Sequence, residues 1–279
     1  RLEISTKQLV DGLITGNYHS IFKGNGIEFS EIREYVPGDD IRSIDWKVTA
    51  RYNHPYVKEF IEERELHVYF VLDMSGSGSY GNNISKKRKS LEIAASLMFA
   101  ALRNNDSIGV FLITDSIEKF IPARKGKKHV LQILSTILAF QPESNQTNLK
   151  TSFAHISKII KKKSIMFVFS DFFDQTDFFK PLKILRNKHD LILFKIIDLR
   201  EQEIPEIGLI HLEDEETGEQ LLVNTSDSFF RQNYSQISQD HESTLVFNFK
   251  KLKIDFIKII SDEKYEIPLK KFFQKRNRK

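Results

Sequence analysis

Apolar positions in the middle of the chain follow two alternating patterns, short continuous runs and helical repeats. The apolar run from His67 to Leu72 follows a charged stretch and predicts a buried strand. Apolar residues between about 85 and 104 recur at helical spacing, which predicts an amphipathic helix. A second strand is expected at Ser107–Ile113. The same patterns predict helices around 130–138, 149–162 and 177–187, and strands at 164–169 and 191–197.

The alternation of strands and helices decides the expected fold class. Consecutive strands separated by helices need crossover connections, and such connections place the strands parallel to one another. We therefore expect an α/β fold of the Rossmann-like, doubly wound type. Its mostly parallel sheet should be flanked by helices on both faces.

The C-terminal third adds a hairpin to this pattern. Apolar stretches at 209–212 and 220–223 flank a turn that contains Gly218, which predicts a β-hairpin inserted at about 207–224. Beyond it, a helix at 227–251, a strand at 254–259 and a helix at 267–274 are expected. Residues 66–279 should thus form the main domain. Residues 1–65, dense in turn residues and charges, are expected to be a segment packed on the core.

Composition narrows the class of protein. Hydrophobic residues make up 40% and charged residues 29%, a profile typical of a globular rather than a disordered chain. The sequence has no cysteine, which excludes disulfides, thiolate metal sites and cysteine nucleophiles. The longest apolar runs, such as 165–169, are too short to span a bilayer. The net charge of +4 is modest and spread along the chain, so no nucleic-acid partner is expected.

A candidate metal site begins where the first predicted strand of the sheet ends. Asp73 is followed by hydroxyl residues at alternate positions, Ser75 and Ser77, and two glycines, Gly76 and Gly78, allow a sharp loop. Ligands of open parallel sheets bind beyond the carboxyl ends of the strands. Hard oxygen atoms are the ligands that Mg²⁺ prefers. By itself, however, D-x-S-x-S is a weak signal, because a polar turn that caps a helix also explains it.

Two further loops are predicted at the same edge of the sheet. Thr147 precedes a predicted helix, and its hydroxyl can therefore lie near a helix N-terminus. Asp171 closes the strand predicted at 164–169, which places its carboxylate on the edge that carries Asp73. Three loops with two carboxylates and three hydroxyls thus converge on one crevice, and this convergence favours a metal site over an isolated turn.

In chain order, this set resembles the metal-ion-dependent adhesion site of von Willebrand factor type A domains. The resemblance implies an incompletely coordinated Mg²⁺ (or Mn²⁺ or Ca²⁺), with a position left for water or for a partner's carboxylate. The site would then be a recognition device and not a catalyst. Phe172 departs from the pattern, because many such domains have glycine after the aspartate. The implied ligands are Asp73, Ser75, Ser77, Thr147 and Asp171.

A second signature precedes the metal motif and comprises Phe22–Phe29, Arg33–Arg42, Ile44–Trp46, Ala50–Arg51 and Val57–Phe60. The signature resembles the bacterial family catalogued as domain of unknown function 58 (DUF58). That resemblance implies work with a MoxR-type AAA+ ATPase, and with other von Willebrand factor type A proteins, in chaperone-like complex assembly or stress response. Many members carry two transmembrane helices upstream, and without them this chain is expected to be cytoplasmic. The resemblance covers nearly the whole chain.

The physical role of this N-terminal block is open. Gly38, Asp39 and Asp40 predict a turn. A structural brace is the favoured interpretation, a docking surface for the ATPase is the second, and a catalytic centre is the third. Charged side chains that could form an ion-pair network locking the block to the sheet are Arg33, Arg42, Arg51, Asp39 and Asp45.

The usual enzyme motifs are missing from the sequence, so we expect a binding module and not an enzyme. Neither Ser75 nor Ser77 has the flanking glycines of a G-x-S-x-G nucleophile elbow. P-loop and H-E-x-x-H motifs are also lacking. The alternative hypothesis is a metal-dependent hydrolase that uses Asp73 and Asp171, with Asp174 as the obvious nearby carboxylate for a general base.

Overall fold

The structure, a computed structural model, describes residues 28–277 except 53, 62–65 and 80–83. Predictions for residues 1–27 therefore lie outside the described residues. The chain divides into two compact units, with the boundary between Leu66 and His67. Each unit is described by itself, and the packing of the N-terminal segment on the core stays a prediction.

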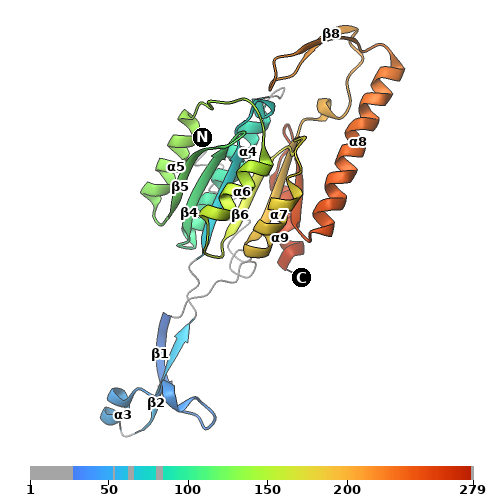
Figure 1. Ribbon diagram of the computed structural model, residues 1–279. Coiled ribbons are helices and arrows are strands. Elements are labelled where there is room, and N and C mark those ends of the chain that lie inside the picture. Colours follow the sequence, from blue (N-terminus) through green and yellow to red (C-terminus); the bar gives the residue numbers. More distant parts are fainter. Residues whose placement is uncertain (1–27, 53, 62–65, 80–83, 278–279) are drawn as a thin grey trace. The chain divides into compact units, whose positions relative to one another are not determined.

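A six-stranded sheet with the order β10-β7-β6-β3-β4-β5 forms the centre of the larger unit (Figure 1). Neighbouring strands are parallel except for the antiparallel pair β4 and β5. The predicted α/β class with a mostly parallel sheet is confirmed. The strands are β3 (His67–Asp73), β4 (Ser107–Ile113), β5 (Ile117–Arg124), β6 (Ile165–Ser170), β7 (Asp190–Ile197) and β10 (Asp255–Ile260).

Helices cover the sheet, as the alternating pattern predicted. Helix α4 packs against β3, β4, β6 and β7, and helices α6 and α7 pack against each other. The side chains of α6 and α7 share a core cluster with alternate residues of the strands, which sets them on the face opposite α4. The helices are α4 (Lys86–Arg103), α5 (Lys127–Ala139), α6 (Leu149–Ile159), α7 (Phe179–Lys188), α8 (Ser228–Lys251) and α9 (Glu266–Asn277).

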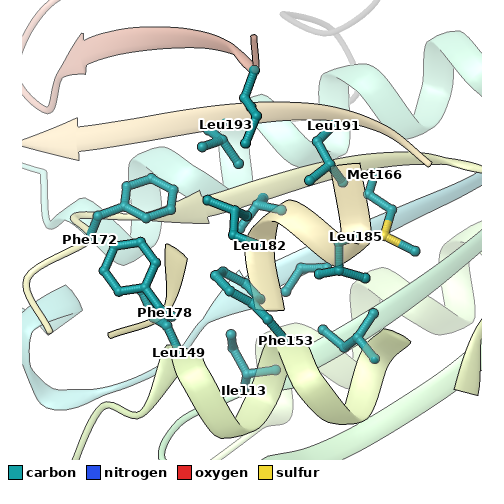
Figure 2. Close-up of a cluster of buried hydrophobic side chains, with 14 of the residues drawn as sticks. Ile113, Leu149, Phe153, Met166, Phe172, Phe178, Leu182, Leu185, Leu191 and Leu193 are labelled. Atoms are coloured by element: carbon teal, nitrogen blue, oxygen red, sulfur yellow. The ribbon is translucent and has the colours of Figure 1, made fainter. Parts of the chain in front are cut away.

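The strand alternation assigns each core residue to one face of the sheet. Tyr69 and Val71 of β3 belong to the cluster with α6 and α7, part of which Figure 2 shows around Phe153 and Leu182. The intervening Phe70 is fully buried but lies outside that cluster, as expected for a residue on the other face. Each such side chain contributes about 1.5–3 kcal/mol on burial, so this core fixes the strands that carry the polar loops.

Strand β5 was not predicted. It pairs antiparallel with β4 at the end of the sheet, and its side chains are only half-buried or exposed. Charged residues and Pro122 interrupt its apolar pattern. Both features are typical of an edge strand, which needs no continuous apolar run.

The predicted hairpin is confirmed as β8 (Leu209–Glu213) and β9 (Gln220–Asn224), an antiparallel pair. Its turn contains Gly218, whose φ of 74° lies in the left-handed region that favours glycine. At its base, the buried Thr225 donates its hydroxyl to Gly208 O at 2.7 Å. The hairpin is therefore fastened to the chain that precedes it.

The smaller unit consists of the antiparallel strands β1 (Glu28–Glu34) and β2 (Tyr56–Ile61), with the 3-10 helix η1 (Ile41–Ser43) and helix α3 (Trp46–Tyr52) between them. Gly38, with φ of 115°, occupies the predicted turn. Within the described residues of the whole chain, no helix is both long and apolar enough to cross a bilayer.

Of the five charged side chains predicted to lock this block to the sheet, Arg33 and Asp39 pair with each other inside the smaller unit, and an ion-pair contact with the sheet stays a prediction. Arg33 donates to both carboxylate oxygens of Asp39, at 2.7 and 2.9 Å. That hydrogen bonding lowers the pKa of Asp39 to about 2. Asp45 pairs with Lys58 at 3.3 Å, a partner that was not predicted. These pairs brace the turn and the strand within the unit, as a structural role for the block would require.

Candidate metal centre

The order of the strands places a crevice beside β3 and β6. The chain leaves β3 for β4 on one side, and it leaves β6 for β7 on the other. The loops that follow these neighbouring strands therefore diverge, and such a switch point is where open parallel sheets bind ligands. Asp73 is the last residue of β3, and Asp171 directly follows Ser170, the last residue of β6. The fold thus brings the two predicted carboxylates to the same edge.

The loop after β3 folds around the carboxylate of Asp73. Its Oδ1 accepts hydrogen bonds from the Ser75 amide at 3.1 Å and from the Ser75 hydroxyl at 2.7 Å. The hydroxyls of Ser75 and Ser77 are 3.3 Å apart. Ser170 donates its hydroxyl to Asp73 Oδ2 at 2.6 Å. A continuous set of oxygen atoms therefore runs from β6 through Asp73 to Ser77.

Asp171 lies at the other side of this set and is paired with a buried lysine. Lys86, at the start of α4, donates to Asp171 Oδ2 at 2.7 Å and to Glu201 Oε1 at 2.5 Å. Asp171 Oδ1 accepts from the Phe173 amide at 3.1 Å. Lys86 is only 3% exposed, so its ammonium group is a fixed part of the site.

Burial and charge shift the pKa values of the two aspartates in opposite directions. Burial, and next the negative charge of Asp171, raise the pKa of Asp73 to about 6. Burial also acts to raise the pKa of Asp171, but the ammonium of Lys86 and hydrogen bonds, among them one from Ser77, hold that pKa below its ordinary value. The Lys86 ammonium therefore favours the ionised form of Asp171, whereas Asp73 keeps an uncompensated cost of ionisation.

Thr147 faces a carboxylate that the sequence did not point to. Its hydroxyl donates to Glu216 Oε1 at 2.6 Å, and its amide donates to Glu216 Oε2 at 3.3 Å. The Gly76 amide donates to Asn145 O at 2.8 Å, which ties the Thr147 loop to the loop of Ser75 and Ser77. Thr147 and Ser77 line the same cavity of about 650 Å³. The structure therefore brings Thr147 to the site, with Glu216 against it.

A second cavity, of about 280 Å³, is also lined by Ser77. Asp171, Glu201 and Lys195 contribute polar groups to its wall, and Ile197 and Phe173 contribute apolar surface. Lys195 is paired with Glu242. The candidate site therefore borders two cavities that share Ser77, Phe173, Glu201 and Tyr234.

Asp174, the carboxylate considered for a general base, has a capping role in the structure. Its Oδ2 accepts from the Leu149 amide at 2.6 Å, at the start of α6, and from the Thr176 hydroxyl at 2.9 Å. Its Oδ1 accepts from the Thr176 amide at 2.7 Å. These bonds satisfy the orphan donors of a helix end and a turn.

Phe172 occupies the position at which many von Willebrand factor type A domains carry glycine. Its backbone adopts a conformation that favours glycine. Its φ of 58° is left-handed, a conformation that glycine adopts without cost. The phenyl ring is fully buried and lies 5.3 Å, centroid to centroid, from the ring of Phe249 (Figure 2 shows its neighbour Phe178). Burial of the ring offsets the backbone strain, and Asp171 still lies at the end of β6, at the edge that carries Asp73.

The residues present fit a hard divalent cation. Carboxylate and hydroxyl oxygens are the donors that Mg²⁺ takes. Burial, together with the negative charge of Asp171, raises the pKa of the Asp73, Glu201 and Glu216 carboxyls, and the Lys86 ammonium lies beside Asp171 and Glu201. Within the described part of the chain, no group of three His, Cys, Asp or Glu side chains is poised to hold a metal. A cation bound beside Asp73 and Asp171 would therefore also need the serine and threonine hydroxyls.

Four residues of the site were not predicted, although three of them carry some signal in the sequence. Ser170 directly precedes Asp171, Glu216 lies in the predicted hairpin turn, and Lys86 begins the predicted helix. Their role is visible only in the structure, because each of them forms its hydrogen bond with a residue that is 69 to 115 positions away in the sequence. Glu201, at the end of the 3-10 helix η3 (Leu199–Glu201), had no such signal. The unpredicted residues are Lys86, Ser170, Glu201 and Glu216.

The sequence matches one family model and several uncharacterized proteins. A family model described as "Protein of unknown function DUF58" matches residues 31–244. The chain is 27% identical over 280 residues to the uncharacterized protein Rv1480 of Mycobacterium tuberculosis (strain ATCC 25618 / H37Rv), covering 99% of this chain and 88% of the relative. The uncharacterized protein Mb1516 of Mycobacterium bovis matches with the same identity and coverage.

Among solved structures, the chain is similar to the conserved hypothetical protein BatB from Bacteroides thetaiotaomicron. That similarity covers 77% of this chain and 100% of the other, with 12% identity and a TM-score of 0.46.

Proposed function

The chain belongs to the DUF58 family, and from this premise we propose that it is a metal-dependent protein–protein interaction module with a von Willebrand factor type A-like site. One observation carries the proposal: Asp73, Ser75, Ser77 and Asp171 converge at the switch point of the sheet. We further propose Mg²⁺ as the cation, with Mn²⁺ or Ca²⁺ as substitutes, because the donors are all hard oxygens.

Each residue has a defined task in this proposal. Asp73 supplies the carboxylate whose ionisation the site otherwise opposes, and Ser75 and Ser77 supply hydroxyl oxygens. Lys86 holds Asp171 in place by a charged hydrogen bond, which leaves that carboxylate positioned but partly neutralised. A bound cation would supply a positive centre to which an acidic side chain of a partner protein can bind.

The partner we propose is a MoxR-type AAA+ ATPase, as the family resemblance implies, with a chaperone-like role in complex assembly in the cytoplasm. The energy for remodelling would come from the ATPase, and this chain would present or recognise the client. The proposal of a binding module is supported by the capping role of Asp174, which already accepts three hydrogen bonds and is thereby a poor general base.

Partner capture with and without the cation tests this proposal. The tagged chain is incubated with the purified ATPase in Mg²⁺ or in excess chelator, and Asp73→Asn is compared with Asp177→Asn. Asp177 is 53% exposed and pairs with Lys180, three residues along the chain, so its substitution is the matched control. We expect capture by the wild-type chain and the control in Mg²⁺ only, and none by Asp73→Asn. If neither the chelator nor Asp73→Asn reduces the amount of ATPase captured, the metal site is not the contact surface.

A further inference from the structure

The edge of the sheet at which the parallel strands begin is strongly basic. Residues 124–128, 161–163 and 250–253 hold ten lysine and arginine side chains and no acidic one, and all ten are exposed. The second and third segments precede β6 and β10, and Arg124 pairs with Ile108 at the start of β4. The fold thus gathers charges that are spread along the sequence onto one surface, which we call the basic edge.

The helix dipole accounts for only part of this charge. Helices α6 and α8 end at the basic edge, and a positive side chain is stabilised near a helix C-terminus. Helix α5 begins there instead, with Lys127 and Lys128 in its first turn, where the dipole disfavours a cation. Two aspartates at this edge, Asp190 and Asp255, are already paired with Arg276. The excess of positive charge therefore indicates a surface for an anionic partner.

The opposite charge is concentrated in one segment of the same unit. Residues 201–219, which lead into the hairpin and form its tip, contain eight acidic residues and no lysine or arginine. Six of these eight are exposed. The hairpin face that carries Glu213 also carries Leu209 and Leu222, which are 69% and 57% exposed. The hairpin therefore presents apolar and acidic groups together.

The hairpin cannot reach the basic edge of its own chain, because its tip is held where the parallel strands end. Glu216 accepts from the Thr147 hydroxyl at 2.6 Å. A Cβ atom added at Gly76 would lie 2.5 Å from the carbonyl oxygen of Glu215, so the backbone of the tip also contacts the loop after β3. The acidic tip and the basic edge thus lie at opposite ends of the sheet (Figure 1). Any pairing of the two surfaces joins separate molecules.

The two surfaces also match in length. Six strands spaced about 4.8 Å apart make the basic edge about 24 Å wide, from β10 to β5. The five-residue strands β8 and β9 are about 17 Å long. One hairpin can therefore lie along most of the basic edge.

We propose that the chain associates with a second copy of itself, with the acidic hairpin of one molecule on the basic edge of the next. This contact needs no cation, so the inference goes beyond the proposed function. Because two different surfaces meet, the contact is head-to-tail and leaves one hairpin and one basic edge open to further copies. Opposite charges set the orientation and the rate of encounter, and the exposed leucines add apolar burial.

Sedimentation velocity with two complementary variants tests this contact. The edge variant combines Lys161→Glu with Lys163→Glu, and the hairpin variant combines Glu215→Lys with Glu219→Lys. All four side chains are exposed, and far-UV circular dichroism checks that each variant keeps the fold. Chelator is present throughout, so that the result does not depend on a cation.

The matched control combines Lys180→Glu with Lys183→Glu. It makes the same change of net charge as the edge variant, at two exposed positions near the start of α7. That end of α7 lies on the side where the parallel strands end, away from the basic edge. A loss of association that depends on net charge alone would therefore appear in the control as well.

We expect the wild-type chain and the control to associate with rising concentration in about 0.1 M NaCl. Both should dissociate in about 1 M NaCl, where the Debye length falls from about 10 to about 3 Å. Each complementary variant alone should associate at least about tenfold more weakly. An equimolar mixture of the two should form a dimer and nothing larger, because it joins one intact hairpin to one intact basic edge.

Three results would overturn the proposal. The first is a wild-type chain that stays monomeric in low salt, and the second is an association that is not restored by mixing the two variants. The third is a monomeric chain that binds phosphatidylserine vesicles or duplex DNA, with binding lost in the edge variant and kept in the control. That result would assign the basic edge to another anion.

Discussion

The role of the buried ammonium group can be tested by Lys86→Met. Methionine keeps the length of the side chain and removes its charge. The side chains of Lys86 and Asp171 are 4% and 9% exposed, and their charged atoms are 2.7 Å apart. The substitution leaves Asp171 buried, without its cation and next to the like charge of Asp73.

The expected cost follows from this burial. Removing one partner of a buried ion pair costs about 3–5 kcal/mol, because the remaining charge loses its compensation. Glu201, the second partner, is 32% exposed and can be solvated, which places the estimate near the lower end of the range, at about 3 kcal/mol. The matched control is Arg88→Met on the same helix, where the 3.7 Å pair with Glu92 is exposed and contributes less than about 1 kcal/mol.

Urea unfolding followed by far-UV circular dichroism measures this difference. Fluorescence of the single tryptophan is unsuitable, because Trp46 lies in the smaller unit and is 67% exposed. Added Mg²⁺ should stabilise Lys86→Met more than the wild-type chain, since the variant has one more unbalanced carboxylate. If Lys86→Met is as stable as Arg88→Met, the electrostatic account of the site is wrong.

Three further substitutions probe the strained loop, a buried histidine and the hairpin contact. Phe172→Gly should destabilise the fold by about 2–4 kcal/mol in urea, because the lost ring burial exceeds the relieved strain; a more stable variant would contradict this. Burial lowers the pKa of His189 to about 4 from its ordinary 6.5, so its contribution to stability is complete above pH 6.5. That contribution is lost progressively as pH falls from 6.5 to 4, by about 3 kcal/mol in all, and an unfolding series in which His189→Gln keeps the same acid sensitivity would refute it. Gly76→Ala should speed hydrogen exchange of residues 209–224 and leave the sheet unchanged, and unaltered hairpin exchange would mean that the tip does not need this close approach.

The fold was predictable where burial imposes a simple period. The predicted strand at 67–72 and helix at 85–104 correspond to β3 (His67–Asp73) and α4 (Lys86–Arg103). Nearly every residue of the strand is buried, and the helix buries one face, so the apolar pattern of both segments is strong. β5 escaped prediction because an edge strand with half-exposed side chains has no such pattern.

The buried lysines at the start of α4 could not be predicted from the sequence. Charge runs are usually solvated, yet in the run that begins α4 both Lys86 and Lys89 are buried, at 3% and 4% exposure. Their spacing of three residues turns both toward the interior. Lys86 finds its partners 85 and 115 residues away, and Lys89 donates to Glu263 O at 2.9 Å. No local pattern encodes such distant pairing, because it depends on which loops the sheet brings together.

The most direct test of the central claim is calorimetric titration of Mg²⁺ into the wild-type chain and into Asp73→Asn, which keeps the shape of the side chain and removes its charge. The account predicts saturable binding of one cation to the wild-type chain. It predicts at least tenfold weaker binding to Asp73→Asn, with the same far-UV circular dichroism. Equal binding by both chains, or no binding by the wild-type chain, would contradict the account.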